Sequence, residues 1–314
     1  MYVAAFIPFF LAVQLSEDGA WLYGPEYVFT VHMNLTEIPQ CPPHVRACGD
    51  AAGYRITSRL HCIPKMKKNI LSCSLKFVDG FEFDMIGKKK DVVNRRRNIT
   101  DAPIELFFNE KGIANIVTGQ PARVYDLNIL KTVVEQLNPG DSFNNVGDGT
   151  FVGVAESTIG RCNVTFDVNH RSGAGAENEE KRFHHDFRLK LVSPKLHMTS
   201  TEILVIDKLT NLNDCSCYAD AYFRKYGDMI VDEDLQADLE SMISHMEISE
   251  TSFSSSTTRK GTTVLNHKIY NIIENTKIIL EDIRPASKDL PAIVKPGETK
   301  IIANDDIKNI TINY

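Results

Sequence analysis

The segment that most constrains the fold is a strongly apolar stretch between Pro121 and Asn138. At the helical spacing of about 100° per residue, its large aliphatic side chains gather within roughly 160° of arc. These side chains are Leu127, Ile129, Leu130, Val133, Val134 and Leu137, and only Asp126 interrupts them. A helix over 122–137 with so wide an apolar surface needs apolar partners around most of its circumference. We therefore expect a curved sheet to wrap around it, with a helix lying on one sheet as the alternative.

The rest of the chain is dominated by strand patterns. A hairpin precedes the helix, with strands over 104–108 and 113–117 joined by the turn Asn109–Gly112. The sequence therefore predicts a mainly β fold, in which an antiparallel, barrel-like β-sheet encloses a central α-helix over about 122–137. Two local expectations complete it. Residues 228–250 carry apolar side chains at helical spacing and predict an extra surface helix, and the Ser/Thr-rich residues 252–258 predict a turn.

The first twenty residues resemble a secretory leader. The apolar run from Tyr2 to Val13 has the length of a signal-peptide core and is too short to span a bilayer. We expect a signal peptide over 1–20, a single domain over 21–314, a secreted, extracellular product and no transmembrane anchor. The run lacks a basic start and a clear cleavage site, so an apolar N-terminal strand that is retained is the alternative.

Composition and motifs argue against several classes of function. Hydrophobic residues make up 43% of the chain and charged residues 24%, as in a soluble protein with a packed core. The net charge of -6 does not favour nucleic acid as the main partner. The sequence lacks the usual nucleophile-elbow, phosphate-loop, zinc-protease and dinucleotide motifs, so we expect no enzymatic activity and no cofactor. The best polar candidate, His184-His185-Asp186, would point its histidines to opposite faces of a strand, which argues against a metal site.

Three stretches resemble the N-terminal domain of large lipid transfer proteins, most closely the insect vitellogenins. They are Pro103 to Gly140, the opening Trp21-Leu-Tyr-Gly-Pro-Glu-Tyr-Val-Phe, and Arg259 to Pro296. The resemblance implies a barrel plugged by its central helix, a role in receptor contact, and a disulfide between Cys162 and Cys215. It covers the barrel portion only, so bulk lipid carriage is not implied. The chain is expected to be a free-standing barrel or a fragment of a full lipid transfer protein.

Seven cysteines in a secreted chain predict disulfides with one thiol left over. Cys62 and Cys73 flank the turn at 64–69 and would lie opposite each other if the neighbouring strands pair antiparallel. Cys41 and Cys48 enclose a Pro-Pro loop and could close it. Cys217 is then unpaired. A zinc site at Cys215 and Cys217 would need a second cysteine pair at zinc-finger spacing, which the sequence lacks.

Four sequons predict N-glycosylation, at Asn34, Asn98, Asn163 and Asn309. Alternation of apolar and polar residues over 27–35 and 162–168 places Asn34 and Asn163 on the solvent faces of their strands. Such placement is what attachment of a glycan requires. Chance sequons that carry no glycan are the alternative.

A basic loop is the candidate binding site, formed by Lys88, Lys89, Lys90, Arg95, Arg96 and Arg97. The resemblance implies a lipoprotein-type receptor, whose acidic modules would bind these residues and a second cluster at Lys65, Lys67 and Lys68. A merely solvated loop and a proprotein cleavage site are the alternatives. The sequence thus predicts a secreted, vitellogenin-like module that acts in receptor or protein recognition linked to lipid or yolk transport. The alternative is a carrier of a small apolar ligand.

Overall fold

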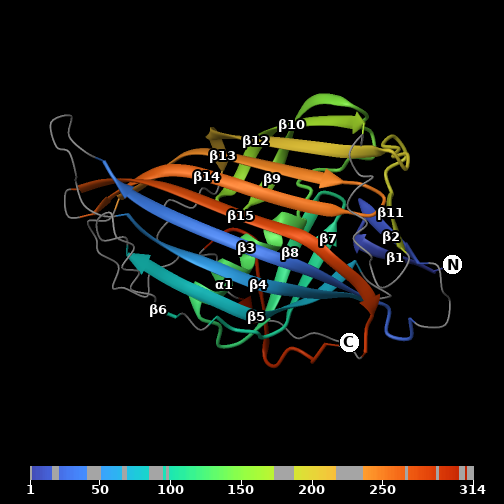
Figure 1. Cartoon of the computed structure of the whole chain (residues 1–314), viewed down its shortest axis with the longest axis horizontal. Coiled ribbons are helices and arrows are strands. Elements are labelled where there is room, and N and C mark those ends of the chain that lie inside the picture. The colour runs from blue at the N-terminus through green and yellow to red at the C-terminus, as the bar shows by residue number, and fades with distance from the viewer. Residues whose placement is uncertain are drawn as a thin grey trace.

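The structure is a computed structural model. It describes residues 2–15, 21–40, 51–65, 69–84, 95–96, 99–172, 187–216, 236–265, 268–287, 290–303 and 308–309. In these ranges the fold is mainly β, with one α-helix and two antiparallel sheets. Figure 1 shows the long strands of the larger sheet in front of the helix α1, with the short strands β1, β2 and β11 at the end near the N-terminus.

The larger sheet has 14 strands, of which 13 follow the order β17-β16-β8-β7-β5-β4-β3-β15-β14-β13-β12-β10-β9. Its strands before the helix in the chain are β3 (Pro25–Pro39), β4 (Ala52–Lys65), β5 (Ile70–Asp84), β6 (Arg95–Arg96), β7 (Ile104–Asn109) and β8 (Gly112–Gly119). Its strands after the helix are β9 (Gly149–Ser157), β10 (Gly160–Ser172), β12 (Glu202–Ser216), β13 (Gln236–Ile248), β14 (Phe253–Leu265), β15 (Lys268–Pro285), β16 (Pro296–Thr299) and β17 (Lys308–Asn309). The described neighbours pair antiparallel throughout.

The sheet curves around the helix but does not close, so the predicted barrel is corrected to an open, strongly curved sheet. A closed barrel needs its two end strands to hydrogen-bond to each other. Here β9 ends one side of the sheet and β17 the other. At β9 the carbonyl of Glu156 accepts a hydrogen bond from Asn138 Nδ2 at 2.8 Å. The segment that follows the helix therefore satisfies an edge group of the sheet.

The helix lies where the sequence predicts it. Residues 124–134 form α1 (Val124–Val134), and a 3₁₀ turn, η1 (Glu135–Leu137), continues it to the expected end. Val124 is 62% exposed, whereas every later residue of α1 and η1 is buried. The helix contacts β15, and η1 contacts β8, β14 and β15. It is therefore enclosed by the concave face of the sheet, as the wide apolar arc predicts.

The apolar run near the N-terminus forms a hairpin of β1 (Tyr2–Ile7) and β2 (Leu11–Leu15). Strand β11 (Phe187–Leu191) pairs with β2 and completes a three-stranded sheet. The ring of Phe6 packs against Tyr27, Phe29 and Phe253 of the larger sheet, with centroids 4.7, 5.6 and 5.2 Å away. In the structure, the N-terminal residues thus form strands of the fold, as in the alternative in which the apolar segment is retained. Cleavage at about residue 20 stays a prediction.

Two local predictions are wrong. Residues 236–248, expected as part of a surface helix, form strand β13. The inward residues Met242 and Met246 are four apart, a spacing that fits two steps of strand alternation as well as one helical turn. The expected Ser/Thr turn is instead the start of β14, where Ser255 and Thr257 are buried on the concave face. Their side chains have polar partners on the helix, which sequence periodicity does not reveal.

Candidate functional site

The junction between the helix and the concave face of the sheet is polar as well as apolar. The polar residues of α1 and η1 are all buried, namely Asp126, Asn128, Lys131, Thr132, Glu135 and Gln136. The apolar arc is evident from the sequence pattern, whereas the role of this second, polar arc is not. Buried polar groups must find partners inside the protein, because leaving them unpaired costs free energy. The sheet provides those partners.

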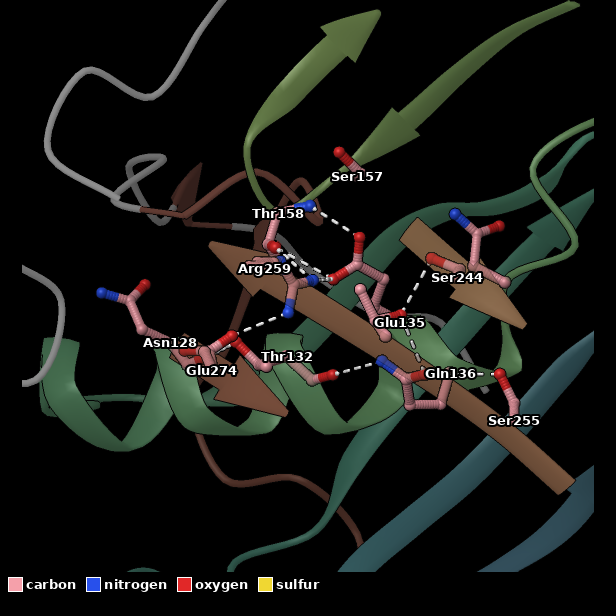
Figure 2. Close-up of polar contacts among 12 residues, drawn as sticks. Asn128, Thr132, Glu135, Gln136, Ser157, Thr158, Ser244, Ser255, Arg259 and Glu274 are labelled. Atoms are coloured by element: carbon pink, nitrogen blue, oxygen red, sulfur yellow. Dashed lines mark hydrogen bonds and ion pairs between the residues drawn. The ribbon is translucent and has the colours of Figure 1, made fainter. Parts of the chain in front are cut away.

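Arg259 on β14 links the helix to the sheet (Figure 2). Its guanidinium binds the carboxylates of Glu135 on η1 and Glu274 on β15, the latter at 2.7 Å between Nη1 and Oε1. Thr158 joins the cluster, since its hydroxyl donates to Glu135 Oε2 at 2.9 Å and its amide donates to Oε1 at 3.2 Å. The side chains of Arg259 and Glu274 are fully buried. One guanidinium thus forms ion pairs with two buried carboxylates from different elements.

Gln136 and Lys131 attach the helix to other parts of the sheet. Gln136 Oε1 accepts hydrogen bonds from Ser255 at 3.3 Å and Thr257 at 3.1 Å, as Figure 2 shows for Ser255. Lys131 Nζ donates to Thr299 Oγ1 on β16 at 3.0 Å and to a carbonyl at 2.8 Å. The helix is therefore bonded to β14 and to β16, which lie far apart in the strand order of the sheet.

The end of the helix is held in the same way. Asn138 Oδ1 accepts a hydrogen bond from the amide of Ile113 at 3.1 Å, next to Gly112. Gly112 has φ +136°, and an added Cβ there would lie 1.8 Å from Asn138 Oδ1. The carbonyl of Asn138 accepts from Lys208 Nζ at 2.9 Å. Burial lowers the pKa of Lys208 to about 8, although Glu135 opposes this shift and Arg259 adds to it. The helix terminus, the hairpin turn and β12 thus form one connected unit.

These polar groups attach the helix to the sheet. The side chains of Arg259 and Glu274 are fully enclosed, and that of Glu135 is 5% exposed. A reacting molecule would have to displace the helix to reach them. The arrangement therefore forms a buried, hydrogen-bonded core where the helix meets the concave face.

Both described disulfides join residues that the sequence analysis paired. Cys62 and Cys73 lie opposite each other on β4 and β5, with an S–S distance of 2.04 Å. Cys162 and Cys215 are bonded across β10 and β12 at 2.05 Å. Each bridge fastens two neighbouring strands of the large sheet. Cys41, Cys48 and Cys217 lie outside the described residues.

The sequons fall on the outer face where their side chains are described. Asn34 on β3 is half-buried between buried Met33 and Leu35. Asn163 on β10 is also half-buried, and its Nδ2 donates to Asp214. The backbone of Asn309 lies in β17, whereas Asn98 is outside the described ranges. Glycosylation at the four positions stays a prediction.

Most of the predicted basic site lies outside the described part of the chain. Lys88, Lys89, Lys90 and Arg97 lie outside the described residues, as do Lys67, Lys68 and the candidate His184-His185-Asp186. Arg95 and Arg96 form β6, whose backbone pairs with Phe81 and Glu82 of β5. Lys65 forms an ion pair with buried Glu105 on β7. The structure therefore brings β6 to the end of β5 and gives Lys65 a partner within the fold.

Two further properties concern metals and membranes. Across the ranges that the structure describes, no three His, Cys, Asp or Glu side chains are grouped as ligands for a metal ion. None of the helical segments in those ranges has the length and hydropathy needed to cross a lipid bilayer.

Comparison with known proteins supports the fold. No protein-family model matches the chain, and no curated protein matches its sequence. Seven chains of solved structures do match. One comes from a structure that describes lipid–protein interactions in lipovitellin, and it matches with a TM-score of 0.56 and 11% identity over 87% of this chain. The match spans 27% of the lipovitellin chain. The chain therefore has a fold similar to that of one part of lipovitellin.

Proposed function

We propose that this chain is a secreted recognition module of the lipid-transport type, which binds a receptor or another protein in connection with lipid or yolk transport. The observation that carries the proposal is the burial of the helix against the concave face. The helix occupies it with apolar side chains and with the ion cluster of Arg259, Glu135 and Glu274. A sheet whose inner face is occupied in this way can present its outer face and loops as a rigid surface.

The binding surface that we propose is the basic loop of residues 88–97. On a chain with a net charge of -6, a local cluster of cations would orient an acidic partner and speed its association. The partner class is a lipoprotein-type receptor, whose calcium-loaded acidic modules match this charge. β6 is part of this stretch and pairs with the end of β5, which would fix one end of the loop to the sheet.

The test compares two variants with equal changes in charge. The first replaces Lys88, Lys89, Lys90, Arg95, Arg96 and Arg97 by serine. The control replaces three arginines and three lysines that are exposed elsewhere on the sheets, namely Arg161, Arg171, Arg188, Lys190, Lys268 and Lys277. The probe is a soluble, calcium-loaded pair of ligand-binding repeats from a lipoprotein receptor, with association rates measured at low and physiological salt.

We expect the loop variant to lose at least about tenfold in association rate at low salt, because several cations that steer the encounter are removed. The control should lose much less, and the salt dependence of the loop variant should be flatter than that of the original protein. Equal losses in both variants would mean that net charge alone drives binding. Unchanged binding of the loop variant would refute this surface.

Carriage of a small apolar ligand is the second candidate. It is favoured by the likeness to lipovitellin, whose structure describes lipid–protein interactions. The helix buried against the concave face argues against a ligand bound in its place, because the side chains of α1 and η1 occupy that position. Mass spectrometry of an organic extract of the purified protein distinguishes the two candidates. Less than a tenth of a lipid per protein is expected for the recognition module, and a stoichiometric lipid would favour the carrier.

A further inference from the structure

The outer face of the large sheet has a pocket beside two register shifts between neighbouring strands. The pocket has a volume of about 400 Å³ and is lined by Val28, Arg59, His61, Lys76, Phe77, Glu281, Asp282 and Arg284. These residues come from β3, β4, β5 and β15, which are neighbours in the sheet. Between Leu280 and Asp282 the register of β15 with β3 shifts, and between Thr57 and Arg59 that of β4 with β5 shifts. Bulges of this kind redirect side chains and recur next to binding sites.

Phe77 shows the effect of the second bulge. Its backbone has φ +53°, a left-handed conformation that is unfavourable for a bulky residue, and the side chain is 77% exposed. The guanidinium carbon of Arg59 lies 6.0 Å from the centre of its ring. Val28 provides a second apolar wall that is buried. The fold thus holds an aromatic ring at the edge of the pocket at a cost in backbone strain.

The three cations of the pocket each have an acidic partner. Arg59 binds Glu281 at 2.7 Å, and Lys76 lies 3.6 Å from Asp101. Arg284 Nε donates to Glu26 Oε2 at 2.7 Å. The hydrogen bond from His61, more than those from other groups, keeps the pKa of Glu26 below its usual value despite burial. Each lining cation therefore already has a carboxylate partner. The remaining lining carboxylate, that of Asp282, is not among these partners.

Two acceptors in this pocket have no hydrogen-bond partner among the described residues. They are Oδ1 of Asp282 and Nε2 of His61, and both atoms are buried. The His61 side chain is 10% exposed, and its Nδ1 lies 2.9 Å from Glu26 Oε1. Because an ionised carboxylate can only accept, we assign the proton to Nδ1, which leaves a lone pair on Nε2. Two such acceptors favour a ligand that donates several hydrogen bonds.

We propose that this pocket binds the lysine side chain of a partner protein, with its ammonium group at Asp282 and His61 and its carbon stem against Phe77 and Val28. An ammonium group supplies three donors and the positive charge that Asp282 lacks. A lysine stem is apolar and packs on an aromatic ring. The rim side chains of Arg59 and Arg284 are about half exposed, at 49% and 45%, so they lie at the solvent-facing edge of the pocket.

This site is separate from the basic loop proposed above, and its ligand has the opposite charge. Failure of one proposal therefore leaves the other standing. The pocket is tested with the whole protein and three small probes, Nα-acetyl-lysine amide, Nα-acetyl-norleucine amide and ethanolamine-headgroup lipid vesicles. Binding is followed by NMR through the ring signals of His61, which a His61→Gln variant identifies. Norleucine has the same carbon stem as lysine and lacks the ammonium group.

The variants are Asp282→Asn, which removes the charge at nearly constant shape, and Phe77→Ala, which removes the ring. Asp238→Asn is the matched control, because Asp238 is an exposed aspartate on β13 outside the pocket. We expect the lysine probe to shift the His61 signals saturably and to bind at least about tenfold more weakly to Asp282→Asn, since a charge-assisted bond is lost. Phe77→Ala should weaken it severalfold, and the control should not. Thermal unfolding confirms that each variant is folded.

Three results would overturn the proposal. Equal binding of the norleucine probe would mean that the pocket only takes apolar groups. Equal affinity of Asp282→Asn and the original protein would mean that the carboxylate does not contact the ligand. Binding of the vesicles without binding of the lysine probe would assign the pocket to a lipid headgroup.

Discussion

The guanidinium of Arg259 and the carboxylate of Glu274 lie 2.7 Å apart, and both side chains are fully buried. The two residues pair directly across β14 and β15, and Arg259 also reaches Glu135 at the end of the helix. Burial of charges is costly unless each is paired. This cluster therefore fixes the position of the helix on the sheet more strictly than apolar packing alone would.

The first prediction concerns this cluster. Arg259→Met should destabilise the protein by about 3–5 kcal/mol, because it leaves two buried carboxylates without their cation. The triple variant Arg259→Met, Glu135→Gln, Glu274→Gln removes the charges together and should recover much of that loss. Urea unfolding measures both. A cost below about 1 kcal/mol for the single variant would contradict the pairing.

The second prediction concerns the inner helix. Leu130 is 2% exposed and Val124 is 62% exposed. Leu130→Ala should cost on the order of 2–4 kcal/mol, from lost burial and the cavity left behind. Val124→Ala should change stability by less than about 0.5 kcal/mol, as substitutions at exposed sites usually do. Similar costs for the two variants would show that the helix is not enclosed.

The third prediction concerns pH. Burial lowers the pKa of Lys208 from 10.5 to about 8, so between these values the unfolded chain binds more protons than the folded protein. Stability rises with pH wherever the unfolded state binds more protons. The free energy of unfolding of the original protein should therefore rise relative to Lys208→Met as the pH increases from 8 to 10, by on the order of 2 kcal/mol. Denaturant unfolding of both proteins at pH 7, 8, 9 and 10 measures it, and a constant difference would refute it.

The fourth prediction concerns the N-terminal hairpin. Its apolar side chains Phe6, Ile7, Leu11, Val13 and Leu15 are at most 1% exposed. Residues 21–314 alone should thus be less stable than residues 1–314 by roughly 5 kcal/mol or more, given about 1.5–3 kcal/mol for each large side chain. Val3→Ser is the control, since Val3 is 61% exposed. Equal thermal stability of the two chains would show that the hairpin is dispensable.

The mature N-terminus of the secreted protein is a separate measurement on the same segment. A start near residue 21 is what the predicted signal peptide requires. A start at residue 1 or 2 would mean that the hairpin is retained as in the structure. Mass spectrometry of the protein secreted from eukaryotic cells gives the answer directly.

The sequence by itself determined the features that depend on local pattern. The period of two in residues 27–35 and 162–168 gave strands with the correct buried faces, and the wide apolar arc gave an enclosed helix. Cys62 and Cys73 were expected on neighbouring antiparallel strands and do pair across β4 and β5, although β4 continues through Pro64 and Lys65, which the sequence assigned to the turn. Each of these follows from neighbours in the chain, because side-chain direction in a strand or helix repeats over a few residues.

Only the tertiary structure decided which elements contact one another. Glu135 binds Arg259, which is 124 residues away, and no local pattern marks that pair. The open sheet, the strand β13 and the outer pocket also depend on contacts between residues that are far apart in the sequence. Leu239 and Met242 both face the core because a bulge lies between Leu239 and Ser241, and such a bulge breaks the alternation that a sequence pattern relies on. These features depend on pairing between strands that are distant in the sequence. The register of those strands is fixed by packing of the whole sheet.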